Sequence, residues 1–327
     1  MKLSLIIPVF NEESCIPLLR ERIGQVFHHK EWDYEVILIN DGSTDQTTEK
    51  IKEWIMTDPH VILLELSRNF GHQAAITAGL KESQGDCVVI MDADLQDPPE
   101  LIPEMLKKWQ EGSQVVLAER SSRSEVGLKR FLFIFFYRAF DLLSDFPIKI
   151  SSGVFSLIDR RVVHHLLSLR EKNRFIPGLR SWVGFSTTNV HYERQPRAVG
   201  EPKQSLRRLL RYGFDAIFSF SYKPLRFSFF FGLIISASCF LYALVLITLR
   251  ILGINVVPGF TTTAVAIFFL GGVILISNGI IGEYLGRVYD EVKNRPLFII
   301  SRKISRPSNN TRFSIEEYTT PQRNHES

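Results

Sequence analysis

The chain has 327 residues, of which 45% are hydrophobic and 23% charged, so it can form a packed core and is not wholly disordered. Its 39 lysine and arginine residues nearly balance 35 aspartate and glutamate residues, and a net charge of +4 does not by itself indicate binding to nucleic acid. The cysteines Cys15, Cys87 and Cys239 lie far apart and follow no ligand spacing, which argues against a disulfide framework and a cysteine zinc site.

The first 120 residues alternate between short runs typical of β-strands and stretches with helical periodicity. The predicted strands cover residues 3–10, 35–40, 61–67, 87–92 and 115–120. The predicted helices between them cover residues 13–27, 44–56, 73–82 and 98–110. This alternation predicts an α/β domain in which helices cover both faces of a mostly parallel sheet.

Polar and charged residues follow the predicted strands at their carboxyl ends. They are Asn11, Glu12, Glu13, Asp41, Gly42, Ser43, Arg68, Asn69, Asp92, Asp94 and Arg120. Ligands of open α/β sheets bind beyond the carboxyl ends of the strands, so we expect the functional site among these residues. No GxGxxG motif follows the first strand and no phosphate-binding GxxxxGK motif occurs, which argues against a dinucleotide dehydrogenase and a P-loop NTPase.

The strongest local signal is the segment VVIMDADLQDPPE at residues 88–100. A predicted buried strand ends in two carboxylates, Asp92 and Asp94, and the amide of Gln96 follows two residues later. Oxygen ligands suit a hard cation such as Mg²⁺ or Mn²⁺, which would share its remaining positions with a diphosphate. Like charges at the end of a buried strand are costly without a cation, so we interpret Asp92 and Asp94 as functional. Asp97 precedes Pro98, and we interpret it as the cap of the next helix.

Two uncharged apolar runs, at residues 227–249 and 261–281, each reach the roughly 20 residues that cross a bilayer core. We predict a transmembrane hairpin, because two such runs close together are unusual for buried core helices. Lysine and arginine are concentrated before the first run and after the second, with Arg250 alone between them. The positive-inside rule then predicts a multi-pass protein of the inner membrane with both termini in the cytoplasm. The short apolar stretch at the amino terminus does not resemble a signal peptide.

Two further stretches, at residues 127–146 and 205–222, combine apolar and basic residues, as amphipathic helices in the headgroup layer do. For the first of them, a helix packed on a soluble core is an equal alternative. The polar segment after Pro296 is predicted to fray. The predicted organisation is a cytoplasmic domain at 1–202, a juxtamembrane helix at 203–226, spans at 227–249 and 261–281, and a cytoplasmic tail at 282–327.

Seven segments carry a distinctive order of motifs. They are PVFNEE at 8–13, NDGSTD at 40–45, SRNFG at 67–71, DADLQDPPE at 92–100, RxPRxxGxxK at 194–203, FSFSYKPLR at 218–226 and GEYLGRVYDEVKNRPL at 282–297. Together they resemble the polyprenyl-phosphate glycosyltransferases of glycosyltransferase family 2, over nearly the whole chain. Within this family the chain looks most like the GtrB-type bactoprenol glucosyltransferases, with the dolichol-phosphate mannose synthases and the aminoarabinose transferase ArnC as cousins.

The resemblance implies a GT-A fold, a UDP-sugar donor and a polyprenyl phosphate acceptor held in the membrane. By residue matching, Pro8, Phe10 and Glu12 would line the nucleobase pocket. Asp41 would bind the uracil or its ribose side, and Asp92 would lie near the ribose and diphosphate. The resemblance also makes a homo-oligomer, a tetramer formed through the hairpin, a familiar arrangement.

The same matching implies a metal site and a set of phosphate-binding residues. Asp94 and Gln96 would hold Mg²⁺ or Mn²⁺. Arg120 would face a phosphate near the reacting centre, and Arg197 and Lys203 would bind the acceptor phosphate.

Two positions depart from the family pattern. Relatives carry GDFRL where residues 153–157 read GVFSL, so Val154 replaces an acid that is often treated as catalytic. Relatives also carry Ser or Thr before the lysine, where this chain has Pro202. Asp159 is a nearby acid at a different position and is the candidate catalytic substitute. The reaction does not require such a base, because a phosphate monoester with a second pKa of about 6 already offers an anionic oxygen.

The sequence therefore predicts inverting transfer of glucose from UDP-glucose to undecaprenyl phosphate. One alternative keeps this chemistry with another donor, such as GDP-mannose, UDP-GlcNAc or UDP-aminoarabinose. A second is a catalytically silent homologue that serves as a membrane scaffold. A third, a processive polysaccharide synthase, is less consistent with the sequence, because it has no QxxRW motif and two spans are few for a channel.

Overall fold

The structure is a computed structural model that describes residues 1–27, 32–120, 153–192, 223–252, 259–307 and 313–318. The chain divides into two compact units. Of the described residues, the first contains those within 1–120, 153–192 and 295–318, and the second contains those within 223–294. The first unit is thus built from chain segments on both sides of the apolar hairpin, not from residues 1–202 alone.

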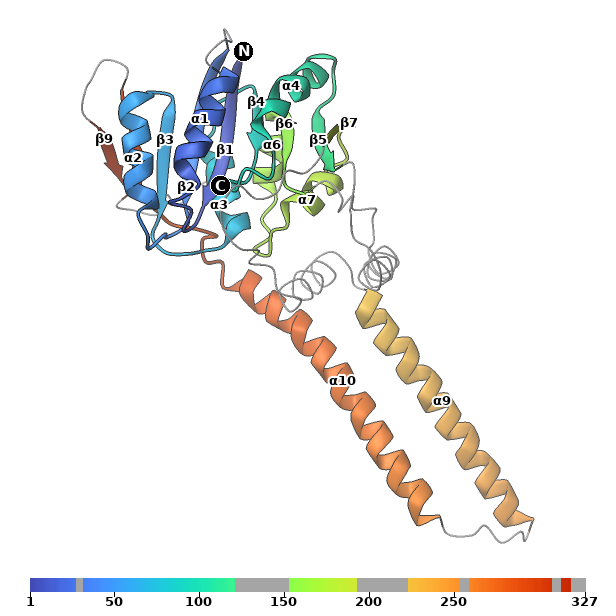
Figure 1. Ribbon diagram of the computed structural model, residues 1–327. Helices are drawn as coiled ribbons and strands as arrows, with labels where there is room; N and C mark the ends of the chain where they lie inside the picture. The colour runs from blue at the N-terminus through green and yellow to red at the C-terminus, as the bar shows by residue number, and fades with distance from the viewer. Residues whose placement is uncertain (28–31, 121–152, 193–222, 253–258, 308–312, 319–327) are drawn as a thin grey trace, which may run out of the picture. The chain divides into compact units, whose positions relative to one another are not determined.

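Four parallel strands form the centre of the sheet in the first unit (Figure 1). They are β1 (Lys2–Val9), β2 (Asp33–Asn40), β3 (Val61–Leu66) and β4 (Cys87–Ile90), in the spatial order β4-β1-β2-β3. The register of β1 against β2 runs from Lys2 beside Asp33 to Val9 beside Asn40. The carboxyl ends of the four strands therefore meet at one edge of the sheet, which confirms the parallel part of the predicted fold.

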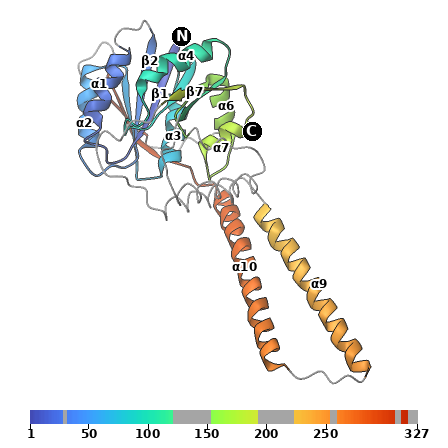
Figure 2. The same cartoon turned by 45° about the vertical axis from the view of Figure 1, so that its right-hand side comes forward.

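Helices cover both faces of this sheet, as Figure 2 also shows from a second side. The helices on one face are α1 (Ile16–Phe27), α2 (Thr47–Thr57) and α4 (Ile102–Gln110), the last preceded by the 3-10 turn η1 (Pro99–Leu101). The other face carries α3 (His72–Glu82) and α6 (Arg160–Ser168), and α6 contacts α7 (Ile176–Trp182). Helix α3 approaches the sheet closely, since a Cβ at Gly79 would lie 2.6 Å from Ile6 Cγ2.

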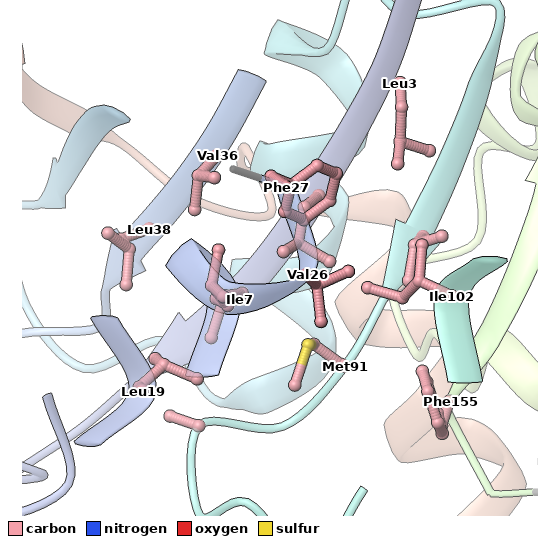
Figure 3. Close-up of a cluster of buried hydrophobic side chains, with 14 of the residues drawn as sticks. Leu3, Ile7, Leu19, Val26, Phe27, Val36, Leu38, Met91, Ile102 and Phe155 are labelled. Carbon is pink, nitrogen blue, oxygen red and sulfur yellow. The ribbon is translucent and has the colours of Figure 1, made fainter. Parts of the chain in front are cut away.

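The core of the first unit lies between the sheet and α1, α2 and α4. Alternate residues of β1, such as Leu3 and Ile7, point into it, because successive side chains of a strand face opposite sides. They pack with residues of the helices and of neighbouring strands, among them Leu19, Val36 and Ile102 (Figure 3). Both faces of the central strands are buried, which accounts for their nearly continuous apolar sequence.

Five further strands extend the sheet to nine, and four of them were not predicted from the sequence. They are β5 (Val115–Arg120), which was predicted, and β6 (Ser156–Asp159), β7 (Thr187–Tyr192), β8 (Ile300–Ser305) and β9 (Ser314–Glu317). The full order is β7-β5-β6-β4-β1-β2-β3-β8-β9. Strand β6 runs antiparallel to β4 and β5, and β8 runs antiparallel to β3, so the sheet is mixed.

The segment after Pro296 was predicted to fray, and in the described residues it instead completes the sheet. Strand β8 pairs with β3, and Ile304 is buried in the core with 2% exposure. Lys303 Nζ lies 3.1 Å from Glu82 Oε2, and the backbone N–H of Ser67 donates to the carbonyl of Ile299 at 2.9 Å. Pairing with β3 and two buried isoleucines, Ile300 and Ile304, thus order a segment whose composition alone predicts disorder.

The second unit contains two long apolar helices, α9 (Lys223–Ile251) and α10 (Phe260–Val292). Each is long and apolar enough to cross a membrane, as predicted. The side chains of Ser228 and Ser277 form a hydrogen bond of 2.9 Å between the helices. Helix α10 continues beyond the predicted span at 261–281, where Arg287 pairs with Glu283 at 2.9 Å. The predicted amphipathic stretches at 127–146 and 205–222 lie outside the described residues.

Candidate active site

Hydrogen bonds join the loop after β1 to the loop after β2. The backbone N–H of Asn11 donates to Ser43 Oγ at 3.0 Å, and Asn11 Oδ1 accepts from the backbone N–H of Thr44 at 2.8 Å. The backbone N–H of Glu12 donates to Thr47 Oγ1 at 2.9 Å. Asn11 has a φ of 53°, a left-handed conformation that Asn tolerates better than most residues. Two neighbouring strand ends therefore form one continuous rim.

Of the three residues predicted for the nucleobase pocket, Phe10 and Glu12 lie in the loop after β1, and Pro8 lies within β1. Pro8 is buried in β1, Phe10 is 42% exposed, and Glu12 is half-buried. The carbonyl of Glu12 accepts the N–H groups of Cys15 and Ile16 at the start of α1. The exposed ring of Phe10 provides an aromatic face beside the strand ends, where a planar base could stack.

Asp41, which follows β2, organises the loop that follows β3. Its carboxylate accepts the backbone N–H groups of Phe70 at 2.7 Å and Gly71 at 2.9 Å, and the residue is only 4% exposed. Burial raises the pKa of Asp41 above its ordinary value, although the two N–H bonds act in the opposite direction. The described contacts of this carboxylate are with the protein backbone, so Asp41 shapes the site through the loop at residues 67–71.

Gly42 allows this loop to lie directly against the loop after β2. Its φ is 74°, and a Cβ there would lie 2.7 Å from the backbone nitrogen of Asn69 and 2.8 Å from the carbonyl carbon of Arg68. A side chain at position 42 would therefore be strained and would also displace the neighbouring backbone. The guanidinium of Arg68 lies 4.1 Å from the centre of the Phe70 ring, in a cation–π contact.

His72 connects the end of β3 to the first acid of the DADLQD segment. Its Nε2 lies 2.9 Å from Asp92 Oδ1, and the two side chains are 41% and 38% exposed. Desolvation acts to lower the pKa of His72, but the charge and hydrogen bond of Asp92 outweigh it and raise this pKa. Asp41 and Asp94 add smaller contributions in the same direction. The strand ends of β2, β3 and β4 are thus linked electrostatically.

Asp94 and Gln96 lie in a tight turn at the end of β4. Asp94 Oδ1 accepts the backbone N–H of Gln96 at 3.1 Å, and Leu95 between them has a φ of 58°. Among the described residues, no three His, Cys, Asp or Glu side chains are grouped as a complete metal site. One carboxylate and one amide oxygen still fit a hard divalent cation that takes its other ligands from substrate oxygens and water.

The remaining predicted residues differ in how the structure places them. Arg120 is the last residue of β5, at the same edge as the acids, and Val154 lies just before β6. Strand β6 begins with Ser156 beside Ile90, the last residue of β4, and Val154 lies two residues before Ser156 in the chain. Arg197 and Lys203, predicted to bind the acceptor phosphate, lie outside the described residues.

Asp159 lies at the opposite edge of the sheet from the other predicted acids. It is the register partner of Cys87, the first residue of β4, because β6 runs antiparallel to β4. Its carboxylate caps α6 by accepting the N–H of Arg161 at 2.9 Å, and it also accepts Trp109 Nε1 at 2.9 Å. Burial acts to raise the pKa of Asp159, but the bonds from Arg161 and Trp109 outweigh it and lower this pKa. The structure therefore argues against a catalytic role for Asp159, which we leave out of the site.

Sequence reasoning missed two members of this region and misassigned a third. His72 directly follows the SRNFG segment, and that position next to a polar motif was the available signal. Asp97 does not cap the next helix, since Pro98 is the residue before η1. Instead, Asp97 is 2% exposed and accepts the hydroxyl of Tyr192 at 2.6 Å. No local pattern indicates that pairing, because 95 residues separate the partners.

Comparison with known proteins gives the class of this enzyme. The sequence model of the family Glycosyl transferase family 2 matches residues 4–167, which include the acids at the strand ends. The chain is a glycosyltransferase and belongs to this family. The GT-A-type fold expected from the sequence, with an α/β sheet domain followed by two apolar helices, is thereby confirmed.

The similar proteins match nearly the whole chain. An uncharacterized glycosyltransferase of Bacillus subtilis, YkcC, is 42% identical over 91% of this chain and 93% of its own length. A prophage-derived bactoprenol glucosyl transferase of Shigella flexneri is 42% identical over 92% of this chain and 98% of its own. Among solved structures, glucosyl-3-phosphoglycerate synthase from Mycobacterium tuberculosis, in complex with Mn²⁺, UDP and glucosyl-3-phosphoglycerate, matches 66% of this chain and 77% of its own at 18% identity and a TM-score of 0.48.

Proposed function

We propose that this glycosyltransferase transfers glucose from UDP-glucose to a polyprenyl phosphate, such as undecaprenyl phosphate, with inversion at the anomeric carbon. The observation that carries the proposal is that three polar groups lie at one edge of the sheet. They are Asp41, the His72–Asp92 pair and the Asp94–Gln96 turn. Relatives about 42% identical over 92% of the chain are named bactoprenol glucosyl transferases, which supports the acceptor and the sugar.

In this proposal the chain binds the donor across the ends of β1, β2 and β4. Phe10 and the rim at Glu12 contact the base, and Asp92 contacts the ribose and diphosphate. Asp94 and Gln96 would hold Mg²⁺ or Mn²⁺ where the donor diphosphate binds. The bound cation would stabilise the negative charge that develops on the departing diphosphate.

The reaction is a single displacement in which the acceptor is already a nucleophile. An oxygen of the lipid phosphate forms a bond to the anomeric carbon while the bond from that carbon to the diphosphate breaks, and UDP leaves with the electron pair. An anionic phosphate oxygen carries no proton that must be removed, so a valine at position 154 is compatible with activity. Arg120, Arg197 and Lys203 are proposed to offset the charge of the two phosphate-bearing substrates.

The two apolar helices give the protein access to an acceptor that stays in the bilayer. Each buried CH₂ contributes about 0.8 kcal/mol, so a polyprenyl chain remains in the membrane and its phosphate remains at the surface. We propose that α9 and α10 span the inner membrane as a hairpin, with both termini in the cytoplasm and the site on that side. Assembly into a tetramer through this hairpin is part of the same proposal.

The test uses the full-length protein in detergent with radiolabelled UDP-glucose, undecaprenyl phosphate and Mg²⁺ or Mn²⁺. Label is expected to enter the lipid fraction, to be absent when a chelator is added, and to give a β-linked product by NMR. Parallel reactions with GDP-mannose, UDP-GlcNAc and UDP-aminoarabinose identify the donor. Faster transfer from one of these would replace glucose in the proposal, and no transfer from any donor would favour the silent scaffold.

A further inference from the structure

The hydrogen bond between Tyr192 and Asp97 joins the end of β7 to the end of the DADLQD segment. The hydroxyl of Tyr192 donates to Asp97 Oδ1 at 2.6 Å, and the two residues are 7% and 2% exposed. A buried carboxylate is costly unless it is well hydrogen-bonded, so a short bond at this place is a strong restraint. It acts on a residue that follows the Asp94–Gln96 turn directly.

That turn has a backbone conformation that requires restraint. Leu95 has a φ of 58° and is 1% exposed, and bulky residues rarely adopt the left-handed region. Such conformations persist where the surrounding structure determines them from several sides. Before the turn, the backbone N–H of Met91 donates to the carbonyl of Ile6 at 3.1 Å, which holds the chain against β1. After the turn, Asp97 is held by Tyr192.

Tyr192 is itself held firmly by its neighbours. Its ring packs edge-on against Phe155 with 5.9 Å between ring centres, and Phe155 is 1% exposed. The carbonyl of Phe155 accepts the N–H of Ala118 in β5 at 3.2 Å. Tyr192 is also the register partner of Arg120, at the ends of β7 and β5. Tyr192 is therefore held by β5, to which β7 is paired, and by Phe155, the residue before β6.

We propose that Tyr192 is a positioning residue for the metal-binding turn. Its hydroxyl, acting through Asp97, keeps Leu95 in its left-handed conformation. In that conformation the side chains of Asp94 and Gln96 would present their oxygens to one divalent cation. This role rests on the proposed function, because the cation is the one that binds the donor diphosphate. Tyr192 would act on the metal only through Asp97, so its loss is expected to weaken metal binding without removing a ligand.

The test compares two Tyr→Phe variants that each delete one hydroxyl bonded to an aspartate. Tyr192→Phe removes the bond to Asp97 and keeps the ring against Phe155. Tyr34→Phe is the matched control, since the Tyr34 hydroxyl lies 3.3 Å from Asp58 Oδ2 at the amino edge of the sheet. Calorimetric titration of Mn²⁺ into the full-length protein saturated with UDP measures metal affinity directly, and thermal unfolding of each variant reports on folding.

Tyr192→Phe is expected to weaken Mn²⁺ binding about 5- to 10-fold, the usual effect of one hydrogen bond. Tyr34→Phe is expected to bind Mn²⁺ with an affinity within about 2-fold of that of the unaltered protein, because the hydrogen bond that it removes is remote from the metal-binding turn. Asp97→Asn keeps an oxygen acceptor for the Tyr192 hydroxyl and is also expected to bind nearly normally. Equal Mn²⁺ affinity in Tyr192→Phe and Tyr34→Phe would overturn the inference, as would a loss in Asp97→Asn alone.

The same titration separates this inference from the proposed function. If the unaltered protein binds UDP and Mn²⁺ but Tyr192→Phe binds both equally well, the positioning role fails and the glycosyltransferase proposal stands. If the unaltered protein binds no Mn²⁺ in the presence of UDP, the metal-assisted function fails, and the positioning role fails with it.

Discussion

Glu35 and Asp41 lie at opposite edges of the central sheet, and their surroundings shift their pKa values in opposite directions. At the amino edge, Glu35 accepts Ser4 Oγ at 2.6 Å and the backbone N–H of Gln84 at 2.6 Å, and Lys2 Nζ lies at 2.9 Å. Burial acts to raise the pKa of Glu35, but these bonds and the charge of Lys2 outweigh it and lower this pKa. The ionised carboxylate at this edge stabilises the fold.

For Asp41, at the carboxyl edge, the balance is reversed. Burial outweighs the hydrogen bonds of Asp41 and raises its pKa, and Asp92 and Asp94 place like charges two residues apart. Two of the three non-glycine residues with positive φ in the described chain, Asn11 and Leu95, also lie here. Strain and unfavourable charge at one edge of a well-packed sheet are typical of a functional site, because ligand binding can offset them. The comparison supports the proposed site at the carboxyl edge and a stabilising role for Glu35 at the amino edge.

The largest expected effect is a loss of activity without a loss of stability, at the carboxyl edge. Asp94→Asn is expected to lower the rate of sugar transfer by about 10³-fold or more, because it removes the charge of a proposed ligand of the cation. The melting temperature is expected to stay the same or rise, since one of two neighbouring like charges is lost. Glycosyl transfer assays and calorimetric unfolding measure the two quantities. Transfer at the unaltered rate in Asp94→Asn would contradict the division of the edges.

A matched pair of glycine substitutions sharpens the comparison. A Cβ at Gly42 would lie 2.7 Å from Asn69 N at the carboxyl edge, and one at Gly85 would lie 2.6 Å from Ser4 N at the amino edge. Gly42→Ala and Gly85→Ala are each expected to cost about 1–3 kcal/mol of unfolding free energy. Gly42→Ala alone should raise the KM for the donor, because it displaces the loop at residues 67–71. Denaturant unfolding and steady-state kinetics test both expectations, and an equal rise in KM for both variants would refute the local effect.

The smallest expected effect concerns the pH dependence of stability at the amino edge. The folded pKa of Glu35 lies below its unfolded value, so its contribution to stability is present above about pH 4.5 and is lost as pH falls through the folded pKa. Glu35→Gln is therefore expected to cost about 1–3 kcal/mol near neutral pH. The difference between the two proteins should narrow below pH 4.5 in urea unfolding experiments. A difference that stays constant down to pH 3 would show that charge is not the cause.

Much of the central sheet could be predicted because its signals are local. The runs at β1 to β5 are apolar and short, the helices between them have clear periodicity, and parallel topology follows from the alternation. Strands β6 and β9 have only four residues each, and β8 carries Arg302 and Lys303. Strands that are this short or this charged gain most of their stability from pairing with a neighbour, so the sequence contains little signal for them.

The candidate site could be predicted in part for the same reason. Asp41, Asp92 and Asp94 follow strands that the sequence identifies, and parallel pairing brings those strand ends together. Asp159 was misplaced because its position depends on the direction of β6, which is antiparallel to β4. A residue near the active-site motif in the chain can therefore lie at the far edge of the sheet.

The sequence by itself determined the family, the two apolar helices and the acids that follow the parallel strands, because each depends on a short motif or a local periodicity. Only the tertiary structure decided that Asp41 binds the backbone of the β3–α3 loop, that His72 pairs with Asp92, and that Tyr192 reaches Asp97. These contacts join residues that are 20 to 95 positions apart. Their geometry depends on strand order and direction, which long-range packing sets and no local pattern encodes.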